Sequence, residues 1–211
     1  MRSFYLDIVD STNEEAKRLI RDGTLREPAW LLAREQTAGR GSRGRSWSSP
    51  RDAGIYLTVV EIPFPADVAP TTALTLAAGV GCAEAIREAT GIEVQLKPIN
   101  DLYVAGRKLG GILTETIIQN GAIEAVITGI GVNVRRADRP VVETSARPVC
   151  IEELVAADAF TKLDIENFVA SLVTRIRSRH ADLLKHGPDR IRRVWERYEA
   201  PGASLPDEWN A

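Results

Sequence analysis

The chain has 211 residues, of which 44% are hydrophobic and 27% are charged, and its formal net charge is −2. This composition supports one good-sized folded domain and excludes a mainly disordered chain. The near-neutral charge also argues against a dedicated nucleic-acid-binding protein, so basic residues matter only where they cluster.

The chain begins with a predicted strand and helix. Residues 4–9 alternate apolar and polar side chains, which indicates a strand. Ser11 is a predicted helix N-cap, and Glu14 three residues later completes the pattern of a capping box. The helix should end before Gly23, because glycine favours the backbone conformation that terminates helices.

Further strands and one long helix follow. We predict strands over residues 29–35, 54–62 and 94–100, the last with a proline near its exit. Residues 71–91 are rich in small apolar side chains and predict a long helix that is buried on most sides. Two hairpins come next, one turning at Ala105-Gly106 and the other, with a stronger turn signal, at Asn120-Gly121.

The C-terminal part is predicted to be helical. Residues 135–150 are polar and aperiodic and indicate a loop, helices begin at residue 151, and Pro188 opens a further short helix. Strands and helices that do not alternate regularly predict an α+β domain, with a mixed, largely antiparallel sheet and helices on one face. One apolar helical stripe is formed by Ile165, Phe168, Val169, Leu172, Ile176, Leu183 and Leu184.

Cysteine and histidine indicate no catalytic or metal site. Cys82 and Cys150 lie far apart without a metal-binding spacing, so we expect reduced thiols in a cytoplasmic protein. His180 and His186 fall in a helical stretch and are expected at its surface, which leaves a Ser-His-Asp hydrolase unsupported. We find no metal-ligand spacing, no secretion signal and no apolar run long enough to span a membrane.

Residues 39–47, GRGSRGRSW, contain two phosphate-loop patterns. They fit the G-x-G-x-x-G dinucleotide fingerprint and, with Arg45 in place of lysine, the Walker A loop. Both loops need a following helix at whose N-terminus the phosphate binds, and the strand predicted from residue 54 leaves too little chain for one. What remains is a glycine-jointed loop with three guanidinium groups, which is either an anion-binding loop or a solvated surface loop.

Two later segments carry polar residues toward the same rim of the predicted sheet as residues 36–47. Residues 96–112 surround the first hairpin, and residues 129–134, GIGVNV, end a strand. Taken singly, each polar residue fits an ordinary role as a strand-edge charge or a turn residue. The residues concerned are Lys97, Asn100, Asp101, Arg107, Lys108, Gly129, Gly131 and Asn133.

Four segments occur in a characteristic order: DSTN (10–13), QTAGRGSRGRSW (36–47), LKPINDLYVAGRKLGGILTE (96–115) and GIGVNV (129–134). Together they resemble the catalytic domain of biotin–protein ligases, or biotin–[acetyl-CoA-carboxylase] ligases, over roughly residues 5 to 200. The resemblance implies a class II synthetase-like biotin/lipoate ligase fold. It also implies a catalytic domain over residues 1–200, with residues 201–211 as a remnant or truncated start of a C-terminal SH3-like domain.

The resemblance implies a two-step reaction. The carboxylate of biotin attacks the α-phosphate of ATP, assisted by Mg²⁺, to give biotinyl-5′-AMP and pyrophosphate. A lysine of the biotin carboxyl carrier protein, part of acetyl-CoA carboxylase or a related carboxylase, then attacks the mixed anhydride. Two other functions stay open: a non-ligating relative that binds biotin or an acyl adenylate, and a relative that transfers lipoate or octanoate.

The resemblance also implies roles for individual residues. Lys108 would bridge the biotin carboxylate and the α-phosphate, and Asp101 would orient an attacking or bridging lysine. The implied catalytic residues are Lys108, Arg40, Arg45 and Asp101. The implied biotin-binding residues are Ser11, Thr12, Asn13, Gln36, Gly39, Arg40, Trp47, Lys108 and Gly111. The implied ATP- and adenylate-binding residues are Arg43, Arg45, Lys97, Asn100 and Asn133.

This chain departs from the family pattern in two motifs. The family commonly reads G-R-G-R-R-G-R, and here Ser42 replaces an arginine. A charge-assisted bond is worth roughly 1.5–3 kcal/mol, so we predict tens of fold weaker retention of biotinyl-AMP and labelling of non-cognate lysines. The family's K-W-P-N-D is here Lys97-Pro98-Ile99-Asn100-Asp101, which changes the packing expected around the pocket.

The family also differs in what surrounds this domain. Relatives commonly continue beyond a W-x-x-Y helix, here Trp195 and Tyr198, into a small β-barrel, of which we expect at most a remnant. No space for a helix-turn-helix precedes residue 10, so we expect no operator binding. Family members often dimerise through sheet edges, and an exposed edge strand would permit a homodimer.

Overall fold

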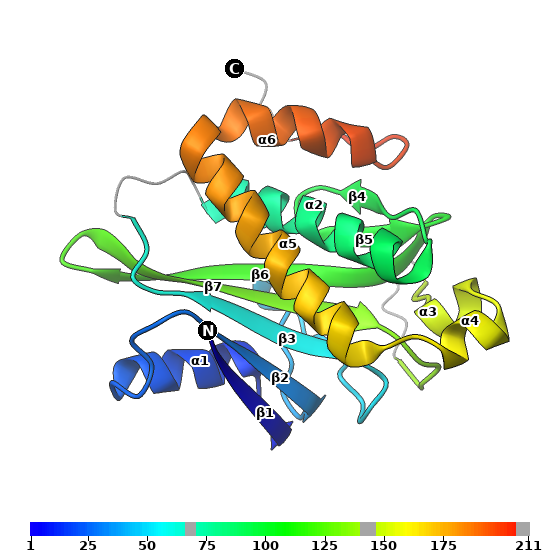
Figure 1. The fold of residues 1–211 in the computed structure, drawn as a ribbon, viewed down its shortest axis with the longest axis horizontal. Helices are drawn as coiled ribbons and strands as arrows, with labels where there is room; N and C mark the ends of the chain where they lie inside the picture. Colours follow the sequence, from blue (N-terminus) through cyan, green and yellow to red (C-terminus); the bar gives the residue numbers. More distant parts are fainter. Residues whose placement is uncertain (66–70, 140–146, 206–211) are drawn as a thin grey trace.

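The computed structural model describes residues 1–65, 71–139 and 147–205. Its strands form one sheet in the order β1-β2-β3-β7-β6-β5-β4 (Figure 1). They are β1 (Arg2–Val9), β2 (Ala29–Gln36), β3 (Gly54–Glu61), β4 (Gln95–Lys97), β5 (Asp101–Val104), β6 (Arg107–Gln119) and β7 (Ala122–Asn133). β1 and β2 are parallel and the other neighbouring pairs are antiparallel, which confirms the predicted mixed, largely antiparallel sheet.

Helices cover both faces of this sheet to different extents. They are α1 (Thr12–Arg21), α2 (Thr71–Thr90), α3 (Ile151–Leu154), α4 (Ala157–Thr161), α5 (Ile165–His186) and α6 (Pro188–Trp195), with 3₁₀ turns η1 (Ser42–Gly44) and η2 (Glu196–Tyr198). The long helices α2 and α5 lie on one face, with α6 beside them (Figure 1). α1 contacts β2, β3 and β7 from the other face, so the prediction of helices on one face holds for the long helices but not for α1.

Strand alternation separates the two apolar clusters. On β3, Leu57 and Val59 join the large cluster with α2 and α5, whereas Val60 joins the smaller cluster beneath α1. α2 is buried along most of its length, as predicted. Gly81 allows the close approach of α5, because a Cβ at this position would lie 2.8 Å from the backbone nitrogen of Ile176.

Both predicted hairpins are present. Ala105-Gly106 has φ values of 49° and 74°, and Asn120-Gly121 has φ values of 51° and 79°. Two successive positive φ values are what a two-residue type I′ turn needs. The strand predicted over residues 94–100 is shorter, because the chain turns at residues 98–100 to enter β5. The loop predicted over residues 135–150 lies partly outside the described residues.

The predicted capping box at the start of α1 is wrong. Ser11 occupies the N-cap, as predicted, but its side chain makes no capping hydrogen bond. The backbone N–H of Thr12 instead donates to Oε1 of Gln36 at 2.9 Å, and Glu14 pairs with Lys17 at 2.9 Å. The helix start is thus satisfied by a side chain from β2, which leaves the Ser11 hydroxyl for other partners.

The prediction of a surface position is wrong for His180. Its side chain is fully buried, with Nδ1 next to the Glu61 carboxylate and Nε2 3.0 Å from the carbonyl oxygen of Leu74. His180 follows Ile176 by one helical turn and therefore lies on the buried stripe of α5. The other residues of the predicted stripe are buried, except that Ile165 is half-buried and Leu184 is 40% exposed. His186 is exposed, as predicted.

Candidate active site

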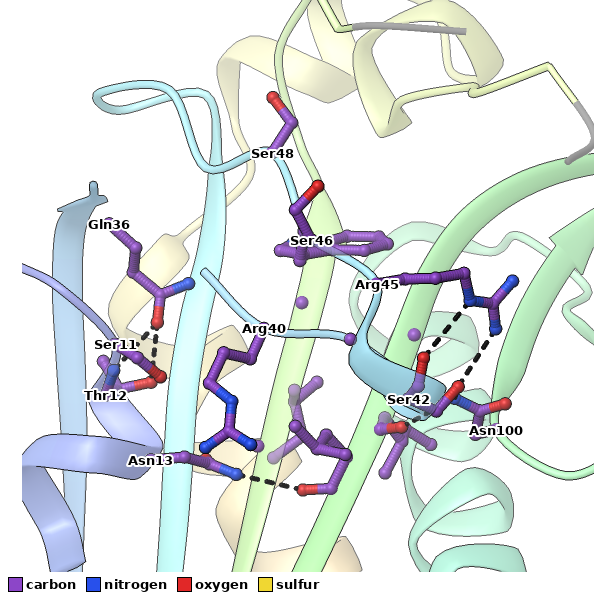
Figure 2. A pocket seen from close by; sticks show the side chains of 18 of the residues that line it. Ser11, Thr12, Asn13, Gln36, Arg40, Ser42, Arg45, Ser46, Ser48 and Asn100 are labelled. Carbon is purple, nitrogen blue, oxygen red and sulfur yellow. Dashed lines mark hydrogen bonds between the residues drawn. The ribbon is translucent and has the colours of Figure 1, made fainter. Parts of the chain in front are cut away.

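A pocket of about 320 Å³ opens on the α1 face of the sheet (Figure 2). Its walls come from the start of α1, the end of β2, the loop of residues 39–48, and strands β6 and β7. The predicted residues that line it are Ser11, Thr12, Asn13, Gln36, Arg40, Arg45, Trp47, Asn100, Lys108, Gly111 and Asn133. The sheet order therefore brings together the four segments that carry the family resemblance.

Four predicted site residues lie outside this lining, as far as the described residues define it. Gly39, the first residue of the loop, is buried, and a Cβ there would lie 2.4 Å from the carbonyl oxygen of Trp47. Asp101 stands next to the pocket as the partner of Lys108. Arg43 is exposed, and Lys97 is exposed with its Nζ 5.3 Å from the centre of the Tyr103 ring.

Glycines on two strands form the floor of the pocket. The indole of Trp47 lies across Gly131 on β7, where a Cβ would be 2.4 Å from Nε1, and reaches Gly111 on β6, where a Cβ would be 3.6 Å from the ring. A side chain at Gly131 would therefore displace the indole and the loop that carries it. Within the described part of the chain, Nε1 of Trp47 is buried and has no hydrogen-bond partner.

Lys108 is a half-buried cation in the pocket lining. Its Nζ lies 2.6 Å from Oδ1 of Asp101 and 5.5 Å from the centre of the Trp47 ring, and its side chain is 17% exposed. A register shift between Leu102 and Tyr103 accompanies the pairing of this part of β5 with β6. A lysine held between one carboxylate and an aromatic face can stabilise negative charge that develops nearby.

The loop is tied to the rest of the pocket through Ser42. Arg45 donates to the carbonyl oxygen of Ser42 at 3.2 Å and to its hydroxyl at 3.0 Å (Figure 2). The side-chain amide of Asn100 donates to the same hydroxyl at 3.1 Å and to the carbonyl oxygen of Ile112 at 3.0 Å. Ser42 thus orients Arg45 and connects the loop to Asn100, which lies in the segment of residues 97–101 where this sequence differs from the family motif.

Arg40 is held on the α1 side of the pocket by acidic residues. Its guanidinium pairs with Glu14 and lies 3.5 Å from Glu115. Lys17 bridges the same two carboxylates, at 2.9 Å and 2.7 Å. Burial by itself would raise the pKa of Glu115, but hydrogen bonds from Lys17 and Asn13 and the nearby positive charges hold it below its ordinary value. The carboxylates of Glu14 and Glu115 therefore offset much of the positive charge of Arg40 and Lys17.

Asn133 lies at the opposite end of the pocket. It is 2% exposed, and its amide nitrogen donates to the carbonyl oxygens of Val149 at 3.1 Å and Lys108 at 3.4 Å. Its side-chain oxygen is buried without a partner among the described residues. A buried acceptor without a donor, next to a cavity, is a position that a ligand donor can satisfy.

Some residues of the site carry no clear signal in the sequence. Thr58 and Glu115 are polar residues inside apolar strands, which marks them as unusual but does not reveal their partners. Arg139 lines the pocket from a segment predicted as a loop, where its guanidinium donates to the carbonyl oxygen of Ala53 at 2.7 Å. Among the described residues there is no group of three or more metal-ligating side chains, and no helix could span a membrane.

The chain is similar to known proteins in sequence and in fold. The family described as the biotin/lipoate A/B protein ligase family matches residues 5–133. The chain is 31% identical over 195 residues to the bifunctional ligase/repressor BirA of Bacillus subtilis, over 92% of this chain and 58% of that protein. It is 36% identical over 197 residues to the biotin–[acetyl-CoA-carboxylase] ligase of Paracoccus denitrificans, over 88% of this chain and 76% of that protein.

A solved structure agrees with these sequence relatives. The biotin protein ligase of Aquifex aeolicus, in complex with biotin and ATP, matches with a TM-score of 0.73 and 27% identity, over 94% of this chain and 78% of that chain. The likeness thus includes the sheet, the covering helices and the segments around the pocket. The chain nevertheless spans only 58% of the length of the Bacillus relative.

Proposed function

Because this chain belongs to the biotin/lipoate A/B protein ligase family, we propose that it is a biotin–protein ligase. It activates biotin with ATP and transfers it to a lysine of a biotin carboxyl carrier protein. The observation that carries this proposal is the pocket itself, which has hydrogen-bonding side chains at the start of α1 and the half-buried Lys108 beside the glycine–arginine loop. The alternatives are a biotin- or acyl-adenylate-binding relative without ligase activity and a lipoate- or octanoyl-transferring relative.

The pocket suits biotin because its two ends differ in chemistry. Biotin's uncharged cyclic urea needs both donors and acceptors in a largely apolar site, and Ser11, Thr12 and Gln36 offer these at the start of α1. The biotin carboxylate then extends along the glycine floor toward Lys108. The indole of Trp47 covers this path as an apolar wall.

In the first step, an oxygen of the biotin carboxylate attacks the α-phosphorus of ATP. The bond from the α-phosphorus to the bridging oxygen of the β-phosphate breaks, and pyrophosphate leaves with the electron pair. Lys108 contacts both the carboxylate and the α-phosphate, offsetting their mutual repulsion and the charge that builds up during the transfer. Asp101 keeps Lys108 in place through the 2.6 Å ion pair.

Two further groups serve the nucleotide. Arg45, oriented by Ser42, supplies positive charge to the phosphates from the loop. Asn133 offers an unsatisfied side-chain oxygen to the nucleotide, and Asn100 also lines the pocket. Mg²⁺ would enter the site bound to the phosphates of ATP, because Mg²⁺ commonly binds through substrate phosphates with one or two carboxylates, and Asp101 is the carboxylate at this rim that could contribute a ligand.

In the second step, the uncharged amine of the acceptor lysine attacks the carbonyl carbon of biotinyl-AMP. An amide bond forms, AMP leaves, and the nitrogen loses a proton. The loop of residues 39–48 has to admit the acceptor lysine while it keeps water out.

We also place the protein in the cytoplasm, with the catalytic domain over residues 1–200. We expect no nucleic-acid or membrane partner, and a homodimer that forms through an exposed sheet edge such as β1.

The proposal is tested by biotin-dependent exchange between ATP and labelled pyrophosphate, measured beside transfer of biotin to a carrier domain. Exchange and transfer with biotin, and little exchange with lipoate, are expected. Exchange without transfer would identify the non-ligating relative, and exchange with lipoate in preference to biotin would identify the lipoate-transferring one.

A further inference from the structure

Thr58 lies behind the pocket wall, in the middle of β3. Its side chain is fully buried on the α1 face of the sheet. Its hydroxyl lies 2.7 Å from Oγ1 of Thr12 and 2.7 Å from Oδ1 of Asn13, so it contacts two successive residues that line the pocket. Both contacts are short enough to be hydrogen bonds, but one hydroxyl supplies only one hydrogen.

The orientation of Asn13 decides where the hydrogen of Thr58 goes. The amide nitrogen of Asn13 lies 3.2 Å from the carbonyl oxygen of Leu113 and 2.9 Å from Oε2 of Glu115. Both neighbours are acceptors, so the nitrogen must face them and Oδ1 must face Thr58. A carbonyl oxygen can only accept, and Thr58 therefore donates its hydrogen to Asn13.

The contact between Thr58 and Thr12 must then use the hydrogen of Thr12. A competing acceptor is Oε1 of Gln36, which is 3.1 Å from the Thr12 hydroxyl and already accepts the Thr12 backbone N–H at 2.9 Å. Of the two acceptors, Thr58 is the nearer, at 2.7 Å. With its hydrogen used inside the protein, Thr12 can offer the pocket only lone pairs.

We propose that Thr58 is a positioning residue that fixes the Thr12 oxygen as an acceptor and so selects a ligand head group with N–H donors. This inference rests on the proposed function and names the chemical feature of biotin that the protein recognises. A cyclic urea carries two N–H groups, whereas the dithiolane ring of lipoate carries none. Without the Thr58 hydroxyl, Asn13 loses its donor and the hydrogen of Thr12 is left to the more distant Oε1 of Gln36, at 3.1 Å, so that the acceptor is held less firmly in its direction.

The test compares three variants of the full chain. Thr58→Val removes the hydroxyl with little change in shape, and Thr58→Ser keeps it. Thr128→Val is the matched control, because Thr128 is equally buried on the adjacent strand β7 but its hydroxyl has no hydrogen-bond partner among the described residues. For each variant, KM for biotin and kcat are measured by pyrophosphate exchange, and biotin binding is measured by equilibrium dialysis.

Thr58→Val should raise KM and Kd for biotin by about ten- to thirtyfold, with kcat changed by less than about threefold. Desthiobiotin, which keeps both N–H groups, should lose the same factor. Thr58→Ser should restore most of the affinity, and Thr128→Val should match the wild type. The inference is overturned if Thr58→Val binds biotin like the wild type, if Thr128→Val weakens binding equally, or if Thr58→Ser fails to restore binding.

The two proposals can fail separately. A wild-type protein that binds biotin but shows no pyrophosphate exchange would refute the ligase. Binding to that protein would still support the role of Thr58 if Thr58→Val weakened it and Thr58→Ser restored it. Normal exchange by the wild type, with an unchanged KM in Thr58→Val, would refute the role of Thr58 alone.

Discussion

The two faces of the sheet use the same strands for different purposes. On the face covered by α2 and α5, β3 and β7 contribute Leu57, Val59, Val126 and Ile130 to a continuous apolar cluster. On the other face, the same two strands contribute Thr58, Gly129 and Gly131 to a polar network and a cavity floor. The pleat of a strand therefore separates the residues that stabilise the fold from those that build the pocket.

Close packing against glycine also has different consequences on the two faces. Gly81 lets one helix backbone approach another, and a Cβ there would meet backbone atoms of α5. Gly131 lets the side chain of Trp47 lie on the sheet, and a Cβ there would meet the indole of a loop. A backbone contact between helices cannot yield locally, whereas a loop can move away. The first glycine should therefore matter for stability and the second for activity.

The largest expected effect comes from removing the positive charge of Lys108 in the pocket. Lys108→Ala should lower biotin-dependent pyrophosphate exchange by at least about a hundredfold, because charge stabilisation of this kind contributes several kcal/mol to a transition state. The free energy of unfolding should change little. Lys185→Ala, which removes an exposed lysine near the end of α5, should behave like the wild type. Full exchange activity in Lys108→Ala would show that the catalytic assignment is wrong.

A pair of glycine substitutions tests the comparison itself. Gly131→Ala should reduce exchange by about tenfold or more, since the indole must leave the floor, while the melting temperature changes little. Gly81→Ala should keep the wild-type KM and kcat at low temperature but lose about 1–3 kcal/mol of stability to overpacking. Thermal unfolding and exchange kinetics on both variants decide the matter, and the opposite pattern would contradict the separation of roles.

Ser42→Arg addresses retention of the reactive intermediate. Adding the arginine that relatives commonly carry should slow the release of biotinyl-AMP by about tenfold or more, given the free energy of one charge-assisted hydrogen bond. Labelling of non-cognate lysines should fall with it. Release is followed by chasing radiolabelled biotinyl-AMP with unlabelled ligand. An unchanged release rate would mean that the Ser42 links to Arg45 and Asn100 already close the loop.

The smallest expected effect concerns Tyr56 on β3, which holds the chain at Pro50, just after the loop of residues 39–48. The hydroxyl of Tyr56 donates to the carbonyl oxygen of Pro50 at 2.7 Å, and burial raises the pKa of Tyr56 from 10.0 to about 12. Because the folded pKa is the higher one, this contribution to stability is complete below pH 10 and is lost as the pH rises toward 12. Tyr56→Phe should flatten that alkaline loss. An absorbance titration in which Tyr56 ionises near pH 10 would contradict the raised pKa and the alkaline loss of stability that follows from it.

The fold and the general position of the site could be predicted from the sequence because they depend on local patterns. Alternation of side chains, turn dipeptides and the order of motifs indicated the strands, both hairpins and the segments that meet at the pocket. The direction of a side chain on a loop follows no such pattern. The family resemblance implies that Arg43 and Lys97 bind the nucleotide, whereas the structure places both outside the pocket lining formed by the described residues.

Contacts between residues distant in the chain account for the other differences. The predicted capping box failed because Glu14 finds Lys17 and Arg40, and Gln36 satisfies the helix start. Surface placement failed for His180, whose neighbours Glu61 and Leu74 precede it by more than 100 residues. Hydrogen-bond partners of this kind depend on the packed structure rather than on the local sequence.

The most direct test of the central claim is pyrophosphate exchange with biotin, followed in the same reaction by transfer to a carrier domain. The account predicts exchange that requires biotin and ATP, the appearance of one amide-linked biotin on the carrier lysine, and little response to lipoate. An absence of biotin-dependent exchange in folded protein that binds ATP would contradict it.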